Sequence, residues 1–117
     1  MKMENGPLTG VKVLDLSLLL PGPLCSQHLA DMGAEVIKVE NPRLGDLTRY
    51  MGTKVTKGEH AETGFFLQLN RNKKSICVNI KRDAGRDVIL RLLKDCDILL
   101  EGFRPDTLNE LGIEIGR

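Results

Sequence analysis

The sequence predicts an α/β fold in which helices cover both faces of a parallel sheet. Short apolar runs rich in β-branched residues alternate with segments of helical periodicity, in the order strand, helix, strand, loop, strand, helix, strand. The turn Pro21-Gly22-Pro23 directly follows the first apolar run, and neither a helix interior nor a central strand accommodates it. Open sheets of this kind bind ligands at the carboxyl ends of their strands, so this turn is a candidate ligand site.

The first half of the chain predicts one strand–helix–strand unit. The run Val11–Leu16 is too short for a typical helix and fits a buried strand. Apolar residues at helical spacing predict a helix over Pro23–Met32, with Pro23 in its first turn and Gly33 ending it. The β-branched residues of Glu35–Val39 predict the second strand.

The second half repeats the pattern after a polar segment. Asn41–Glu62 is a long loop that we expect to be mobile, and Phe65–Leu69 fits either a helical turn or a strand. Ser75–Ile80 predicts the third strand and Asp97–Leu100 the fourth. Between them, Asp83–Lys94 predicts a helix capped by Asp83.

The end of the chain predicts only a turn and a short helix. Gly102-Phe103-Arg104-Pro105 reads as the turn, and Asp106 is positioned to cap a helix that Gly112 ends. A doubly wound sheet normally carries more strands than these four, so we expect a truncated domain, a piece of a longer protein.

Composition excludes several classes of function. The chain has 117 residues, is 41% hydrophobic and 28% charged, and carries a net charge of +1, so no bulk charge recruits nucleic acid or a membrane surface. Aromatic residues make up 3%, too few for base stacking, and no apolar run has the length of a transmembrane helix. Cys25, Cys77 and Cys96 lack metal-site spacing and read as reduced thiols of an intracellular, cytoplasmic protein without a metal.

Polar side chains near the strand ends leave several interpretations open. Glu40 ends the second strand, where it is either a solvated residue or the carboxylate that a nicotinamide enzyme places on a ribose. Asp15 lies among apolar neighbours and must be hydrogen-bonded, either to cap a nearby turn or helix or for catalysis. Leu18–Leu20 either forms an apolar wall against a ligand or merely leads into the helix.

Basic residues gather around the last two strands. They are either a solvated rim or a phosphate site, since Arg and Lys both bind phosphate. The residues are Arg71, Lys73, Lys74, Lys81, Arg82 and Arg104.

Several motifs in order resemble one enzyme family. They are LTGVKVLDLS, PGP, LADMGAEVIKVENPRLGD, LNRNKKSICVNIK and CDILLEGFRPDTLNELGI, and together they cover Leu8 to Ile113. The sequence is similar to the N-terminal part of the family III CoA-transferases, a superfamily that includes formyl-CoA and carnitine-CoA transferases and the α-methylacyl-CoA racemases. Pro21-Gly22-Pro23 and Glu101-Gly102-Phe103-Arg104-Pro105 resemble the racemase branch, whereas NRNKKSICVNIK equally resembles the transferases.

The resemblance implies a Rossmann-like CoA-binding domain, with residues 1–117 as its N-terminal part, and an acyl-CoA as the substrate. In the family, the residues at Leu19, Leu20 and Pro21 lie near the pantetheine of CoA. The positions of Val78, Ile80 and Lys81 line the adenosine site. Those of Gly102, Phe103 and Arg104 meet the adenine and phosphates.

Two positions depart from the family pattern. Asn41 stands where the family commonly has an Arg packed on the adenine, and Glu110 replaces a further Arg.

The resemblance also implies that the chemistry lies beyond Arg117. The transferases use an Asp that attacks the thioester, and the racemases use a His and an Asp that exchange the proton next to the thioester carbonyl. The resemblance therefore implies no catalytic residue in this chain and an inactive fragment. The full-length enzyme is expected to be an interlocked homodimer without metal or redox cofactor.

Two alternatives of other classes remain. One is half of a nicotinamide-dependent oxidoreductase, which the absence of a GxGxxG motif disfavours. The other is a non-catalytic interaction module.

Overall fold

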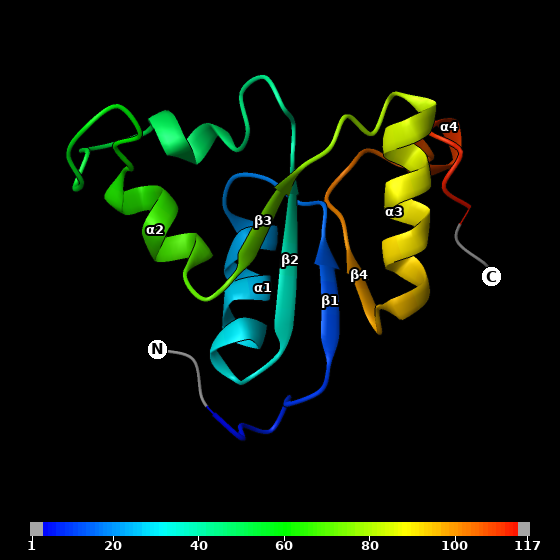
Figure 1. Cartoon of the computed structure of the whole chain (residues 1–117), viewed down its shortest axis with the longest axis horizontal. Helices are drawn as coiled ribbons and strands as arrows, with labels where there is room; N and C mark the ends of the chain where they lie inside the picture. Colours follow the sequence, from blue (N-terminus) through cyan, green and yellow to red (C-terminus); the bar gives the residue numbers. More distant parts are fainter. Residues whose placement is uncertain (1–3, 115–117) are drawn as a thin grey trace.

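Parallel pairing joins all four strands, as the sequence predicts. The computed structural model describes residues 4–114, and its sheet has the order β3-β2-β1-β4 (Figure 1). Each of the three strand pairings is parallel, and Val13 lies beside both Val36 of β2 and Ile98 of β4. The strands are β1 (Lys12–Asp15), β2 (Glu35–Glu40), β3 (Lys74–Cys77) and β4 (Ile98–Leu100).

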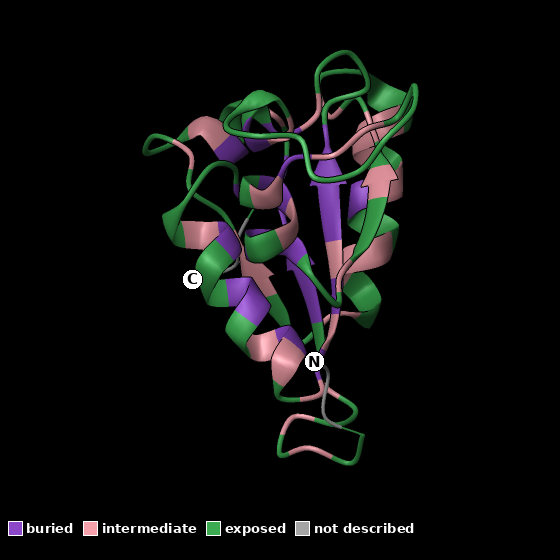
Figure 2. Ribbon diagram, turned by 90° about the vertical axis from the view of Figure 1, so that its left-hand side faces the viewer, coloured by how far each residue is buried: buried purple, intermediate pink, exposed green. Residues whose placement is uncertain are grey.

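Two long helices pack on opposite faces of this sheet. Helix α1 (Pro21–Asp31) packs on β1 and β2, and α3 (Asp83–Asp95) lies over the other face of β1. The shorter helices are η1, a 3-10 turn (Leu47–Tyr50), α2 (Gly64–Asn70) and α4 (Thr107–Glu110). Figure 2 shows that buried residues concentrate in the strands and on the helix faces that point toward them.

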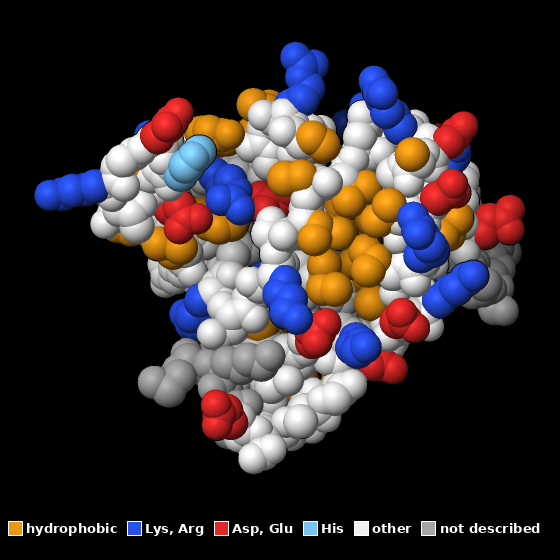
Figure 3. Space-filling view, in the orientation of Figure 1, with side chains coloured by type: hydrophobic (Ala, Val, Ile, Leu, Met, Phe, Trp, Pro, Cys, Tyr) orange, Lys and Arg blue, Asp and Glu red, His pale blue; other side chains and the backbone are white. Residues whose placement is uncertain are grey.

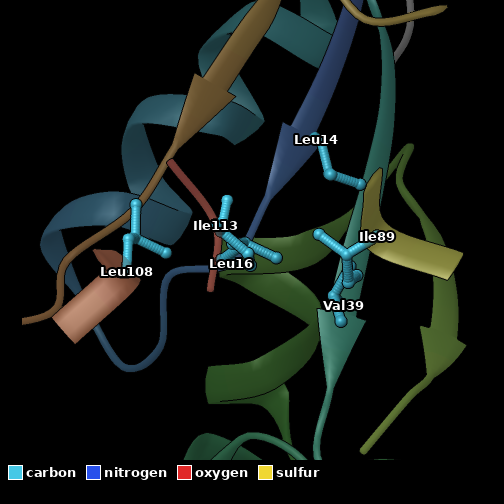
Figure 4. Close-up of a cluster of buried hydrophobic side chains, with 6 residues drawn as sticks. All are labelled: Leu14, Leu16, Val39, Ile89, Leu108 and Ile113. Atoms are coloured by element: carbon cyan, nitrogen blue, oxygen red, sulfur yellow. The ribbon is translucent and has the colours of Figure 1, made fainter. Parts of the chain in front are cut away.

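The alternation of side chains along the strands divides the core in two. Val13 and Val36 pack with Ala30 and Ala34 on the α1 face. Leu14, Leu16 and Val39 point the other way, toward α3 (Figure 4). They form a second cluster with Ile89 of α3, Leu108 of α4 and Ile113.

The predicted elements are confirmed in type, with shifted boundaries. Strand β3 ends at Cys77 rather than Ile80, although the Val78 amide still donates to the Glu40 carbonyl at 3.0 Å. The chain then turns, because the Asn79 side chain accepts a hydrogen bond from the Lys81 amide at 3.1 Å. Helix α1 begins at Pro21, two residues earlier than predicted.

Helix termini give two corrections. Asp83 is the first residue of α3 rather than its cap; Arg82 occupies the cap position without a side-chain bond. Asp106 does occupy the cap position of α4, with a φ of 66°, but its side chain makes no capping hydrogen bond. Gly33 and Gly112 have φ of 106° and 80°, as expected for residues that end helices.

The segment between β2 and β3 contains two elements that the sequence left open or missed. Phe65–Leu69 is helical, within α2, because the Thr63 hydroxyl caps it by accepting the Phe66 amide at 3.1 Å. The long loop contains η1, capped by Asp46.

Among residues 4–114, none of the helices has the length and apolar character needed to cross a bilayer.

Candidate functional site

A cavity of about 180 Å³ opens where the strands end. Its walls come from the ends of β1, β2 and β3 and from the turn after β4, and they are mostly apolar. The lining residues are Leu16, Leu18, Val39, Glu40, Asn41, Val78, Asn79, Ile80, Lys81 and Phe103. Pockets that hold a whole drug-sized ligand have roughly 300–1,000 Å³, so this one fits a single part of a larger molecule.

Five of the ten residues expected at a ligand site line this cavity. They are Asn41, Val78, Ile80, Lys81 and Phe103. They come from three different segments, which the parallel topology brings to one edge of the sheet. Figure 3 shows hydrophobic side chains gathered on the front of the sheet beside α3, with basic side chains along the margin of the patch.

The other five lie outside the lining. Leu19 and Leu20 are exposed on the β1–α1 turn, next to the lining residue Leu18, and Pro21 is exposed as the first residue of α1. Gly102 and Arg104 are exposed on either side of Phe103. A Cβ on Gly102 would lie 4.0 Å from the Ser17 Cβ, which places the two turns side by side.

The basic residues do not form one rim. Lys73 is buried, and its Nζ donates to the Pro23 carbonyl and to Asn70 Oδ1, each at 2.9 Å. Arg71 pairs with Asp31 at the end of α1, with 2.7 Å between Nη2 and Oδ2. Lys81 and Arg104 stay exposed at the carboxyl edge. The rim interpretation and the phosphate interpretation are therefore both wrong for Lys73.

Both interpretations of Glu40 are also wrong. Its side chain is 2% exposed rather than solvated, and its carboxylate already accepts bonds from Arg49, Ser75 and the Asp46 amide. Burial alone raises the pKa of Glu40, but the hydrogen bonds from Arg49 and Ser75 outweigh it and lower the pKa to about 2. A carboxylate occupied in this way has no free oxygen for a ribose.

Asp15 caps the turn that follows its strand, as expected. Its Oδ1 accepts the Ser17 amide at 2.8 Å, and both carboxylate oxygens receive serine hydroxyls, from Ser17 and from Ser26 of α1. Lys73 Nζ lies 3.5 Å from Oδ2. Burial, opposed by Asp15, lowers the pKa of Lys73 to about 8.

A second buried ion pair, between Lys38 and Asp46, was not predicted from the sequence. Lys38 Nζ lies 2.8 Å from Asp46 Oδ2, and the two side chains are 1% and 0% exposed. Lys38 shares the α1 face of β2 with Val36 and Glu40, where side-chain alternation places it. Burial raises the pKa of Asp46, but hydrogen bonds from Lys38 and Thr48 outweigh it and hold the pKa below its usual range.

Known proteins are similar to this chain in both sequence and fold. The model for CoA-transferase family III matches residues 8–116. The chain belongs to CoA-transferase family III. A human succinyl-CoA:glutarate CoA-transferase is 46% identical over 107 residues, which cover 92% of this chain and 24% of the relative. An acyl-CoA transferase of Fusarium pseudograminearum is 48% identical over 115 residues, which cover 94% of this chain and 25% of the relative.

Solved structures extend the similarity to the fold. A CAIB/BAIF family protein from Brucella suis superposes with a TM-score of 0.89 at 36% identity, covering 96% of this chain and 30% of that protein. A hypothetical protein from Mycobacterium tuberculosis gives a TM-score of 0.81 at 39% identity, covering 93% and 29%. The chain spans about a quarter of the length of the curated family III relatives that it matches.

Proposed function

We propose that this chain is the N-terminal CoA-binding part of a family III CoA-transferase that acts on an acyl-CoA. The observation that carries the proposal is the apolar cavity at the carboxyl edge, where Val78, Ile80 and Phe103 meet beside Lys81. A flat adenine suits such walls, and the phosphates of CoA suit exposed cations. The resemblance of the sequence points to the same residues.

The two neighbouring turns extend this site beyond the cavity. Arg104 follows Phe103 and is placed to bind a phosphate of CoA. Gly102 has no side chain, so a base can approach its backbone. Leu19, Leu20 and Pro21 offer an apolar surface to the pantetheine arm, while the family Arg that packs on adenine is replaced here by Asn41, which lines the cavity.

The proposal leaves the reacting carboxylate to the rest of the enzyme. An interlocked homodimer, an intracellular location and an inactive isolated fragment are further predictions of the same proposal. All three cysteines are unpaired thiols in the structure.

Calorimetric titration of the full-length protein with CoA tests the proposal. Saturable binding of CoA is expected, and its absence would remove the CoA-binding function. Arg71→Ala is the matched control, because Arg71 is an exposed arginine paired with Asp31 and outside the cavity lining. This control should bind CoA as tightly as the wild type.

A racemase remains the second candidate because Pro21-Gly22-Pro23 and Glu101-Gly102-Phe103 resemble that branch. Two assays on the full-length enzyme separate the reactions. A transferase moves CoA from an acyl-CoA to a free carboxylate. A racemase instead exchanges the proton next to the thioester carbonyl for deuterium, without moving CoA.

A further inference from the structure

The buried pair of Lys38 and Asp46 carries more bonds than an isolated ion pair. Besides the 2.8 Å contact between them, Asp46 Oδ1 accepts the Thr48 amide at 3.0 Å and the Thr48 hydroxyl at 2.8 Å. Removing two charges from water is costly, and good geometry with added hydrogen bonds is needed to offset the cost. Replacing a buried ion pair with apolar side chains is often neutral or stabilising. Stability alone therefore does not explain why Lys38 and Asp46 are present.

Both members of the pair bind the backbone of the turn after β1. Lys38 Nζ donates to the Ser17 carbonyl at 3.2 Å. The Leu19 amide points at the Asp46 carboxylate, 3.3 Å from Oδ2 and 3.4 Å from Oδ1. The pair therefore holds the turn at two positions, one on each side of Leu18.

The turn adopts a conformation that its own residues do not favour. Leu19 has a φ of 67°, in the left-handed region, which is unfavourable for an L-residue. Strained residues persist where the surroundings enforce them, and they cluster at functional sites. The two contacts to Asp46 supply that enforcement.

The enforced turn presents apolar side chains to solvent. Leu18, Leu19 and Leu20 are 41%, 41% and 50% exposed, and Leu18 also lines the cavity. Packing gives no reason for three consecutive leucines to be exposed on a strained turn. A ligand that covers them gives such a reason.

We propose that Lys38 and Asp46 are positioning residues that fix the Ser17–Leu20 turn as the apolar wall for the pantetheine arm of CoA. This inference rests on the proposed CoA-binding function. The pantetheine arm is a chain of methylene and amide groups, so it needs an apolar surface with a fixed shape. The nucleotide half of CoA binds next to this wall, along β3 and the turn after β4, in the cavity that Leu18 also lines.

The test compares two ligands on the full-length protein. CoA contains the pantetheine arm, whereas adenosine 3′,5′-bisphosphate contains only part of the nucleotide half. The variant Asp46→Asn keeps the side-chain shape but removes the ion pair. It should weaken CoA binding by about tenfold, while its affinity for adenosine 3′,5′-bisphosphate stays within about twofold of the wild type.

A second variant guards against a simple folding defect. Lys38→Met/Asp46→Leu replaces the pair with apolar side chains, an exchange that is often neutral or stabilising. It should remain folded, because it leaves no buried charge without its partner, and still lose CoA affinity selectively. Arg86→Met is the control, because Arg86 donates to the Leu111 carbonyl between α3 and α4, outside the cavity lining. Its affinities for both ligands should equal those of the wild type.

The outcomes separate this inference from the proposed function. A double variant that is folded and keeps full CoA affinity overturns the positioning role while the CoA-binding function stands. Equal losses for both ligands also overturn it, because a general structural effect would lower both affinities. A wild-type protein that binds neither ligand overturns the proposed function itself.

Discussion

The guanidinium of Arg49 binds the carboxylate of Glu40 at two points, with Nε 2.8 Å from Oε1 and Nη2 2.7 Å from Oε2. The same guanidinium lies 3.8 Å above the centre of the Phe66 ring in α2. Arg49 therefore connects the end of β2 to η1 and α2. It ties the first part of the long loop to the sheet next to the candidate site.

This pair predicts a pH-dependent contribution to stability. The pKa of Glu40 falls from 4.5 to about 2 in the folded state. The stabilisation, about 3 kcal/mol, is fully present above the ordinary pKa of glutamate and is lost as the pH falls toward 2. The variant Glu40→Gln should therefore be less stable than the wild type at pH 7, and the difference should shrink below pH 4.5.

Urea unfolding of both proteins at several pH values measures this difference. Glu59→Gln is the control, because Glu59 is exposed in the loop and its replacement should change stability little at any pH. A stability difference for Glu40→Gln that stays constant from pH 7 to pH 3 would argue against the ion pair.

Local patterns predicted the sheet and its long helices because each depends on neighbours in sequence. β-Branched residues predicted β2, and helical spacing predicted α3. The buried charges could not be found in this way, because Lys38 and Glu40 have partners in the aperiodic segment that follows β2. The one local sign of a buried charge is a charged residue inside an apolar strand. This sign led to the prediction that Asp15 is hydrogen-bonded, and it applies equally to Lys38.

The candidate site was predicted only in part for the same reason. Val78, Ile80 and Lys81 stand at a predicted strand end, so topology placed them at the ligand edge. Asp46 belongs to no predicted element, and only the folded loop brings its carboxylate beneath Leu19. Tertiary contacts of this kind leave no periodic trace in the sequence.

Gly85 is expected to be indispensable for the packing of α3. A Cβ at this position would lie 1.9 Å from the Asn79 carbonyl oxygen, which belongs to the turn after β3. Alanine normally improves a helix by up to about 1 kcal/mol over glycine, but here overpacking should dominate and cost about 1–3 kcal/mol. Thermal unfolding of Gly85→Ala measures the result.

The control for this change is Arg91→Ala, an exposed position in the same helix. It should leave the melting temperature nearly unchanged. If Gly85→Ala is as stable as this control, the Asn79 turn moves freely and the close approach has no energetic consequence.

The long loop should divide into a protected and a mobile half. Asp46 and Thr48 are buried, and their amides donate to Glu40 and Asp46 at 2.9 and 3.0 Å. Residues 51–60 are all exposed. Hydrogen exchange should therefore be slow at the two buried amides and fast between residues 56 and 60.

The Leu14 amide in the sheet provides the slow reference for this measurement. Exchange of the Asp46 and Thr48 amides as fast as that of the exposed half would show that the Glu40 and Lys38 contacts do not hold the loop.

Arg104 is expected to supply a large part of the affinity for CoA. Its side chain is exposed on the turn after β4, one residue from Phe103, and CoA carries phosphates that need cationic partners. A hydrogen bond to a charged group is worth about 1.5–3 kcal/mol. The variant Arg104→Ala should therefore bind CoA about ten- to hundredfold more weakly than the wild type, as measured by calorimetry on the full-length protein.

Because the lost partner is a phosphate, the affinity of Arg104→Ala for adenosine 3′,5′-bisphosphate should fall by the same factor, unlike the selective loss expected for Asp46→Asn. Equal CoA affinities for wild type and Arg104→Ala would place the phosphates away from this turn and leave Lys81 as the cation at the edge of the cavity.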